Sequence, residues 1–196
     1  MSIRTFISVP LSDVVRDDLG RIREHISNCS DILPLKKGFK AVKPDNYHIT
    51  LKFLGDVEEK EIPRIRETMQ LAVRDIRPFD VTVHGFSGLP RIEKPRVVYI
   101  QVHDEHSRLA DIYETLNTKL GYIKKEKRKY IPHITFIRIR RQKAWPGLAS
   151  RLSGFLNRRF GVEQVSCIDL MASELNPSGP EYSRLERVPL GECCEI

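Results

Sequence analysis

Two histidines, His48 and His133, each stand two residues before a threonine in an apolar stretch of the chain. The first stretch reads YHITLKFLG (residues 47–55), and the second reads YIPHITFI (residues 130–137). The histidines are 133 − 48 = 85 residues apart, close to half of the 196-residue chain. The other four histidines lack the pattern, and two chance matches among six have a probability of about 2%. The repeat therefore indicates one kind of site built twice.

A pair of imidazoles suits a reaction that needs a general acid and a general base. The ordinary pKa of histidine is near 6.5, so one ring can be neutral while its partner is charged at neutral pH. Threonine hydroxyls are short, uncharged donors that can hold phosphoryl oxygens. A zinc site is the rival interpretation, but zinc needs at least a third protein ligand and neither motif contains Asp, Glu or Cys. The motifs thus favour acid–base chemistry on a phosphate.

Both motifs have the composition of β-strands, rich in β-branched and aromatic residues and bounded by turn signals. Side chains alternate between the two faces of a strand, so Ile49, Leu51 and Phe53 are expected to enter a core. His48 and Thr50 then share the opposite face. Two such strands, related by a duplication, would bring both histidines to one cleft.

The rest of the chain alternates strands with amphipathic helices. Apolar periodicity predicts helices near residues 13–26, 62–76, 109–120 and 148–156, and strands near 3–9, 79–83, 97–102, 162–165, 168–175 and 182–190. Links such as 166–167 and 176–180 are too short for parallel crossovers, so antiparallel pairing is required there. Segments 36–40 and 88–96 have the composition of loops. The predicted class is α+β.

Bulk composition restricts the partners and the compartment. The net charge of 33 − 26 = +7 suits an anionic partner such as nucleic acid, although a basic protein can carry this charge without binding anything. No apolar run approaches the roughly 20 residues of a membrane-spanning helix, and the first residues lack signal-peptide features. A cytoplasmic location is expected. The four cysteines lack metal-ligand spacing and are expected to be free thiols, and Cys193 and Cys194 receive no function.

The paired motifs resemble the HxTx signatures of the two-histidine phosphoesterase superfamily. More closely, the chain resembles the RNA 2′,3′-cyclic phosphodiesterases, also called 2′-5′ RNA ligases. The similarity runs nearly end to end: TFISV (5–9) is similar to the family's first strand, NYHITLKFLG (46–55) and RKYIPHITFIR (128–138) to its motifs, and SELNPSGPEY (173–182) to a C-terminal turn. Phe136-Ile137 replaces the usual Leu-Ala, and Lys129-Tyr130 the common Pro-Phe.

This resemblance implies a single domain over residues 1–196, made of two pseudo-symmetric lobes. Two antiparallel sheets would face each other across a central groove, with helices outside. The implied reaction is hydrolysis of a terminal RNA 2′,3′-cyclic phosphate to a 2′-phosphate, with no metal or other cofactor. His48 would be the proton donor to the 3′-oxygen, His133 the proton acceptor from water, and Thr50 and Thr135 the phosphate-binding residues.

The expected partner is an RNA end or a nucleotide that bears the cyclic phosphate, and the protein is expected to be a monomer. A basic segment that leads to the second motif is the candidate contact with RNA. The run 124–129 can steer a phosphate backbone, or it can be a solvated turn. Arg128, Lys129 and Tyr130 are the candidate RNA-binding residues. Arg138 matches an arginine that the family usually has, but strand alternation puts it opposite His133 unless a bulge intervenes. It is therefore left out of the predicted site.

Two other functions are open at this point. One is a non-catalytic RNA-binding module on the same scaffold, although binding alone would favour arginine and lysine over titratable imidazoles. The other is the reverse reaction, 2′-5′ joining of RNA ends, which can be measurable in vitro because a catalyst accelerates both directions.

Overall fold

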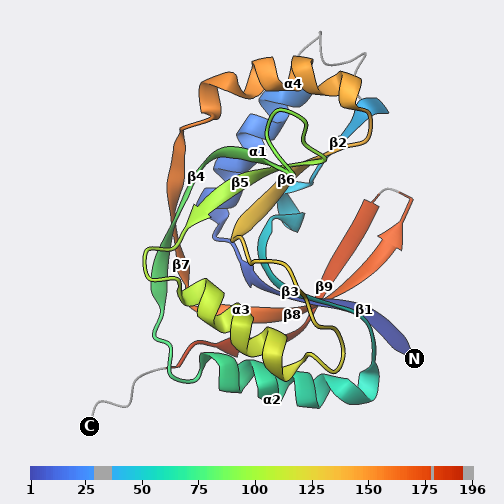
Figure 1. The fold of residues 1–196 in the computed structure, drawn as a ribbon, viewed down its shortest axis with the longest axis vertical. Coiled ribbons are helices and arrows are strands. Elements are labelled where there is room, and N and C mark those ends of the chain that lie inside the picture. Colours follow the sequence, from blue (N-terminus) through green and yellow to red (C-terminus); the bar gives the residue numbers. More distant parts are fainter. Residues whose placement is uncertain (29–36, 178, 192–196) are drawn as a thin grey trace.

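The computed structural model describes residues 1–28, 37–177 and 179–191, and it confirms the α+β class (Figure 1). The helices are α1 (Asp13–Asn28), α2 (Ile62–Val73), α3 (Arg108–Lys119) and α4 (Trp145–Leu152). The strands are β1 (Ser2–Pro10), β2 (Phe39–Ala41), β3 (His48–Glu58), β4 (Phe79–Leu89), β5 (Val97–His103), β6 (His133–Ile139), β7 (Arg159–Val165), β8 (Cys167–Asn176) and β9 (Gly179–Pro189).

The strands form one curled antiparallel sheet with the order β7-β4-β5-β6-β3-β1-β8-β9, and β2 pairs with β6. Along this order the sheet has two halves of four strands, which meet at a single residue pair, Ile49 on β3 opposite Ile134 on β6. Each isoleucine directly follows a motif histidine. Counted outward from this junction, each strand in one half has a counterpart at the same position in the other half. The counterparts are β3 and β6, β1 and β5, β8 and β4, and β9 and β7. The two sheets expected from the sequence are thus the two halves of one continuous sheet.

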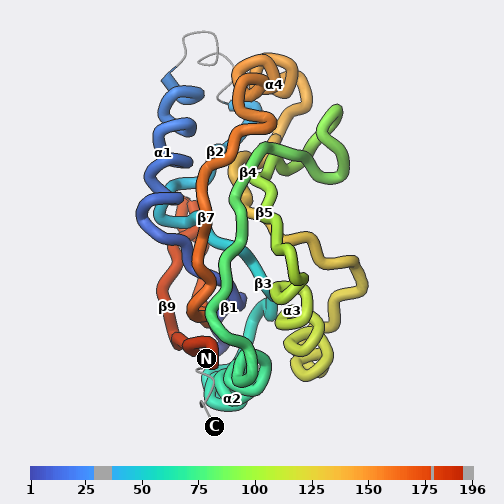
Figure 2. Tube along the Cα trace, turned by 90° about the vertical axis from the view of Figure 1, so that its left-hand side faces the viewer, coloured from blue at the N-terminus to red at the C-terminus, as the bar shows by residue number. Residues whose placement is uncertain are grey.

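The helices cover the two halves separately. Helix α3 packs against β3 and α2, and α2 also contacts β9, whereas α1 contacts β7 and α4. In the two views α2 and α3 lie together at one end of the molecule, and α1 and α4 lie toward the other (Figures 1 and 2). The periodic apolar residues form the buried faces of these helices, as in α1, where Val15, Leu19, Ile22 and Ile26 are buried.

Each central strand carries a bulge just after its threonine. The pairing of β3 with β1 skips Leu51, and the pairing of β6 with β5 skips Phe136. One extra residue shifts the alternation of faces by one position. Phe53 and Arg138, each five residues after a motif histidine, therefore come to the histidine side of the sheet. The prediction of a core position for Phe53 is wrong, because 47% of its surface is exposed.

Several boundaries differ from those expected. Strand β2 lies at the end of the segment expected to be a loop, β4 runs on through the glycines to Leu89, and α4 begins at Trp145 and ends at Leu152. Cys167 is a free thiol, whereas Cys29, Cys193 and Cys194 lie outside the described residues. Among the described residues, no helix is long and apolar enough to span a membrane.

Candidate active site

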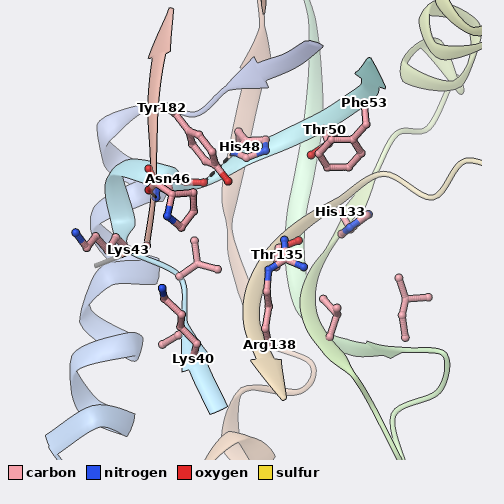
Figure 3. A pocket seen from close by; sticks show the side chains of 16 residues that line it. Lys40, Lys43, Asn46, His48, Thr50, Phe53, His133, Thr135, Arg138 and Tyr182 are labelled. Carbon is pink, nitrogen blue, oxygen red and sulfur yellow. Dashed lines mark hydrogen bonds between the residues drawn. The ribbon is translucent and has the colours of Figure 1, made fainter. Parts of the chain in front are cut away.

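The two motif histidines open onto one groove, because they are the first residues of the two strands that meet at the sheet's centre. His48, Thr50, His133 and Thr135 all line this groove (Figure 3). Since Ile49 faces Ile134 in an antiparallel register, Thr50 lies toward His133 and Thr135 toward His48. The structure therefore brings together the four residues that the sequence motifs predicted.

Both imidazoles are held in the same tautomer by the main chain. Nδ1 of His48 is 2.8 Å from the carbonyl oxygen of Asn46, and Nδ1 of His133 is 2.7 Å from that of Ile131. A carbonyl oxygen only accepts hydrogen bonds, so each Nδ1 carries the proton and donates it. Nε2 is then the nitrogen that can take or give a proton in each ring.

A contact between the segment just before β3 and the edge strand β9 supports the His48 side. The Asn46 side-chain amide donates to the Pro180 carbonyl, 2.9 Å away at the start of β9. The same strand places the Tyr182 ring edge-on to the His48 ring, with centroids 5.5 Å apart, and Phe6 stacks on that imidazole at 4.8 Å. On the other side, Tyr99 of β5 packs against His133 at 5.2 Å. Aromatic rings from other strands of the sheet thus pack against both histidines.

These surroundings make both histidines weak bases. The pKa of His48 is lowered to about 4, mainly by burial; the nearby His133 and Arg138 also lower it, and the hydrogen bond to Asn46 opposes the shift. Burial also lowers the pKa of His133, and the positive charge of Arg138 adds to this effect. Both rings are therefore neutral at pH 7 before an anion binds.

Three cationic side chains give the groove an anion-binding character. Arg138 lines it together with Lys40 and Lys43, which approach from the segment around β2 (Figure 3). Lys40 is paired with Arg138 in the register of β2 with β6. Sequence reasoning missed all three, and Arg138 was excluded by the alternation that the bulge at Phe136 reverses. One signal in the sequence could have identified Arg138. It lies five residues after His133, as Phe53 lies five residues after His48, so the two residues occupy corresponding positions in the two motifs.

The segment before His133 is tied to β3 by hydrogen bonds. The fully buried Lys52 donates from Nζ to Oδ1 of Asn117 and to the carbonyl oxygen of Lys124, both at 2.7 Å. The Tyr130 hydroxyl donates to the carbonyl oxygen of Thr50 at 3.2 Å. These bonds join the two motifs and fix how the chain enters β6.

The three residues predicted to bind RNA are not among the described residues that line the groove. The Tyr130 ring stacks on Tyr113 with centroids 4.6 Å apart, and its hydroxyl is engaged in the bond to Thr50. Arg128 and Lys129 are exposed on the segment that leads to His133. Their contact with RNA stays a prediction.

Within the part of the chain that the structure describes, no three His, Cys, Asp or Glu side chains are grouped so as to hold a metal ion. Among these residues, the two motif histidines therefore have no acidic or thiol neighbour that would complete a zinc site with them.

The fold is that of a known class of protein. A family model described as LigT like phosphoesterase matches residues 9–99, which include the first motif. A crystal structure of TT0787 from Thermus thermophilus has a TM-score of 0.75 and 27% identity, covering 96% of this chain and 99% of that one. The E. coli LigT structure complexed with 3′-AMP shares the fold, with a TM-score of 0.75, 20% identity and coverage of 98% and 100%.

Curated relatives match over almost the whole length. A protein of Methanothermobacter thermautotrophicus is 31% identical over 189 residues, which are 95% of this chain and 98% of the relative. One of Archaeoglobus fulgidus is 34% identical over 186 residues, or 93% and 98% of the two chains. Both are named RNA 2′,3′-cyclic phosphodiesterase. The chain belongs to the RNA 2′,3′-cyclic phosphodiesterase family.

Proposed function

We propose that this protein hydrolyses a terminal RNA 2′,3′-cyclic phosphate to a 2′-phosphate, with His48 and His133 as general acid and base. The observation that carries the proposal is the matched pair of imidazoles, each with Nδ1 held by a main-chain carbonyl and both on one groove. The named activity of the curated relatives supports the same substrate. A cytoplasmic monomer, with one two-lobed domain over residues 1–196, is part of the proposal.

In the proposed step, neutral His133 takes a proton through Nε2 from a water molecule, whose oxygen attacks phosphorus. The bond from phosphorus to the 3′-oxygen breaks, and protonated His48 gives its Nε2 proton to that oxygen. The products are a 2′-phosphate and a 3′-hydroxyl, with His133 protonated and His48 neutral. Exchange of protons with solvent restores the starting state. Water and two imidazoles balance the reaction, so it needs no metal or other cofactor.

The phosphate is held by hydroxyl and guanidinium donors in this account. Thr50 and Thr135 lie on either side of the junction between the half-sheets and can donate to the non-bridging oxygens. Arg138 can donate two parallel hydrogen bonds to the same group and offset its charge. Lys40 and Lys43 extend positive charge along the groove, which suits a substrate that continues as an RNA backbone.

Binding of an anionic substrate also explains how His48 can be protonated at neutral pH despite its low pKa. A general acid must carry a proton, and at neutral pH the free His48 ring carries almost none. A bound phosphate anion favours the charged imidazole and raises its pKa. Substrate binding and protonation of His48 are therefore coupled, and the same coupling supplies the acid only when substrate is present.

Two alternatives share this scaffold. A non-catalytic RNA-binding module would use the basic residues. It would not need two imidazoles in which Nδ1 is bonded to a main-chain carbonyl and Nε2 is left for proton transfer. The reverse reaction, 2′-5′ joining of RNA ends, follows from reversibility of the same step. In dilute aqueous solution we expect hydrolysis to dominate.

The direct test is turnover of an oligoribonucleotide that ends in a 2′,3′-cyclic phosphate, with the product position assigned by ³¹P NMR. We expect a 2′-phosphate as the sole product. A 3′-phosphate, or binding of this RNA without turnover, would refute the proposed reaction. The roles are tested with a substrate whose leaving group is far more acidic. It should partly rescue His48→Ala and do much less for His133→Ala, whereas equal rescue would mean that the roles are wrongly assigned.

A further inference from the structure

The two carbonyl groups that hold the motif histidines are supported in different ways. Asn46, whose carbonyl holds His48, ends a single helical turn that is closed by main-chain hydrogen bonds of its own. Ile131, whose carbonyl holds His133, lies in the stretch 120–132 between α3 and β6, which contains neither a helix nor a strand (Figure 1). The position of this second acceptor therefore depends on contacts with other parts of the protein.

Side chains of α3 and β3 anchor this stretch at every second residue. Its main chain is held at residues 124, 126 and 128, and its last anchor is the side chain of residue 130. The anchoring contacts are those of Lys52 with Lys124, Asn117 with Glu126, Tyr113 with Arg128, and Thr50 with Tyr130. The last of them is one residue before Ile131, so the anchors together fix where the Ile131 carbonyl lies.

Lys52 is the centre of these anchors. Its Nζ donates both to the Lys124 carbonyl and to Oδ1 of Asn117, each at 2.7 Å. The same Oδ1 accepts from the main-chain N–H of Glu126, and Nδ2 of Asn117 donates to the Glu126 carbonyl, both at 2.9 Å. Lys52 thus holds one anchored residue directly and orients the amide that holds the next.

The interior position of Lys52 is a costly place for a charged group. The residue is fully buried (0% exposed), and both of its hydrogen bonds end on uncharged oxygens. Burial lowers the Lys52 pKa, although the charge of Glu126 opposes the shift. An apolar side chain of similar volume would fill the same space without this cost. The contacts with the stretch before His133 are what the lysine adds and an apolar residue would lack.

We propose that Lys52 is a positioning residue for His133. Through its anchors it keeps the Ile131 carbonyl against Nδ1, so that Nε2 is the nitrogen that accepts the proton in the groove. The role of His133 as base rests on the proposed function, whereas its positioning does not require turnover. Loss of Lys52 should therefore change His133 and leave His48, whose acceptor lies in its own turn.

The test removes both members of the central contact, so that neither side chain is left without its partner. In Lys52→Met/Asn117→Leu both become apolar groups of similar size, an exchange that costs little stability. Imidazole ¹⁵N NMR at about pH 7.5 reports the tautomer of each ring. In the wild-type protein both rings should carry the proton on Nδ1. In the double variant His133 should show a mixture of tautomers, while His48 keeps the Nδ1 proton.

The kinetic expectation is a loss in kcat with little change in KM. A misplaced base should lower kcat by about 10- to 100-fold. KM for an RNA 2′,3′-cyclic phosphate should change less than about threefold, because Thr50, Thr135 and Arg138 remain on their strands. A role in stability alone would move neither the tautomer nor kcat in a variant that is folded at the assay temperature.

Glu163→Gln is the matched control for disturbing a buried charged side chain. Glu163 is 4% exposed on β7, and its Oε2 accepts from N and Oγ of Ser12, just before α1, at 2.9 and 2.8 Å. It does not line the groove. This variant should have a lower Tm, with both tautomers and kcat unchanged.

A folded double variant with the wild-type tautomer at His133 and kcat within about twofold of wild type would overturn the inference. Equal changes at His48 and His133 would also overturn it, because they would indicate a general loosening of the groove. If the double variant does not fold, Lys52→Met alone is measured by the same criteria. If the wild-type protein does not turn over the RNA, the proposed function fails, whereas the two tautomers still decide the positioning role.

Discussion

Anion binding in this groove should take up a proton, because burial holds the pKa of free His48 at about 4. Sulfate is a suitable probe, since it mimics a phosphoryl group and stays a dianion from about pH 5 to 7.5. If the bound anion returns the His48 pKa to its ordinary 6.5, linkage makes the affinity fall about 25-fold between these two pH values. The sign follows from the direction of the shift: the complex binds the proton that the free protein releases.

Calorimetric titration with sulfate at constant ionic strength, in buffers of different ionisation enthalpy, measures both the affinity and the protons taken up. Near pH 6 we expect about three-quarters of a proton per anion. His48→Gln should remove most of this uptake while Arg138 and the threonines still bind the anion. An affinity that changes less than about twofold from pH 5 to 7.5, or the same uptake in His48→Gln, would refute the reasoning.

Three further outcomes are expected. Exhaustive chelation should leave turnover intact, and activity lost under chelation but restored by zinc or manganese would point to a metallohydrolase. Thr50→Ala and Thr135→Ala should each lower kcat by about 10²–10³, as for loss of an oxyanion-hole donor, and an effect below tenfold would remove that threonine from the phosphate site. Arg138→Ala should lower kcat/KM about 10- to 150-fold, and Arg138→Lys should restore only part of it because lysine lacks the planar fork; full restoration would contradict bidentate binding.

The sequence predicted that the four motif side chains share one groove, because they lie where local and global signals agree. The motif strands have strong β composition, and the repeated His-x-Thr pattern identifies the same face in both. The antiparallel class followed from short links between strands. The meeting of β3 and β6 at one pair, Ile49 with Ile134, was beyond such reasoning, since tertiary packing decides where two half-sheets join.

Phe53 and Arg138 were missed as groove residues because a bulge leaves almost no mark on composition. In the second motif the adjacent apolar residues Phe136 and Ile137 hint at a break in alternation. In the first motif the corresponding inward residue is Lys52, a charged side chain that alternation alone assigns to solvent. Its burial depends on acceptors from Asn117 and the Lys124 carbonyl, which are distant in sequence. Phe53 and Arg138 were therefore assigned to the wrong face.

The pairing of the two histidines as acid and base is tested most directly by single-turnover hydrolysis of one RNA 2′,3′-cyclic phosphate by four proteins: wild type, His48→Ala, His133→Ala and the double variant. Each single change should lower the rate by at least about 10², the usual range for a general acid or base. The double variant should lose little more than either single one, because the residues act as a unit. A single variant that stays within about tenfold of wild type, or a double variant whose loss is the product of the two single losses, would contradict the pairing.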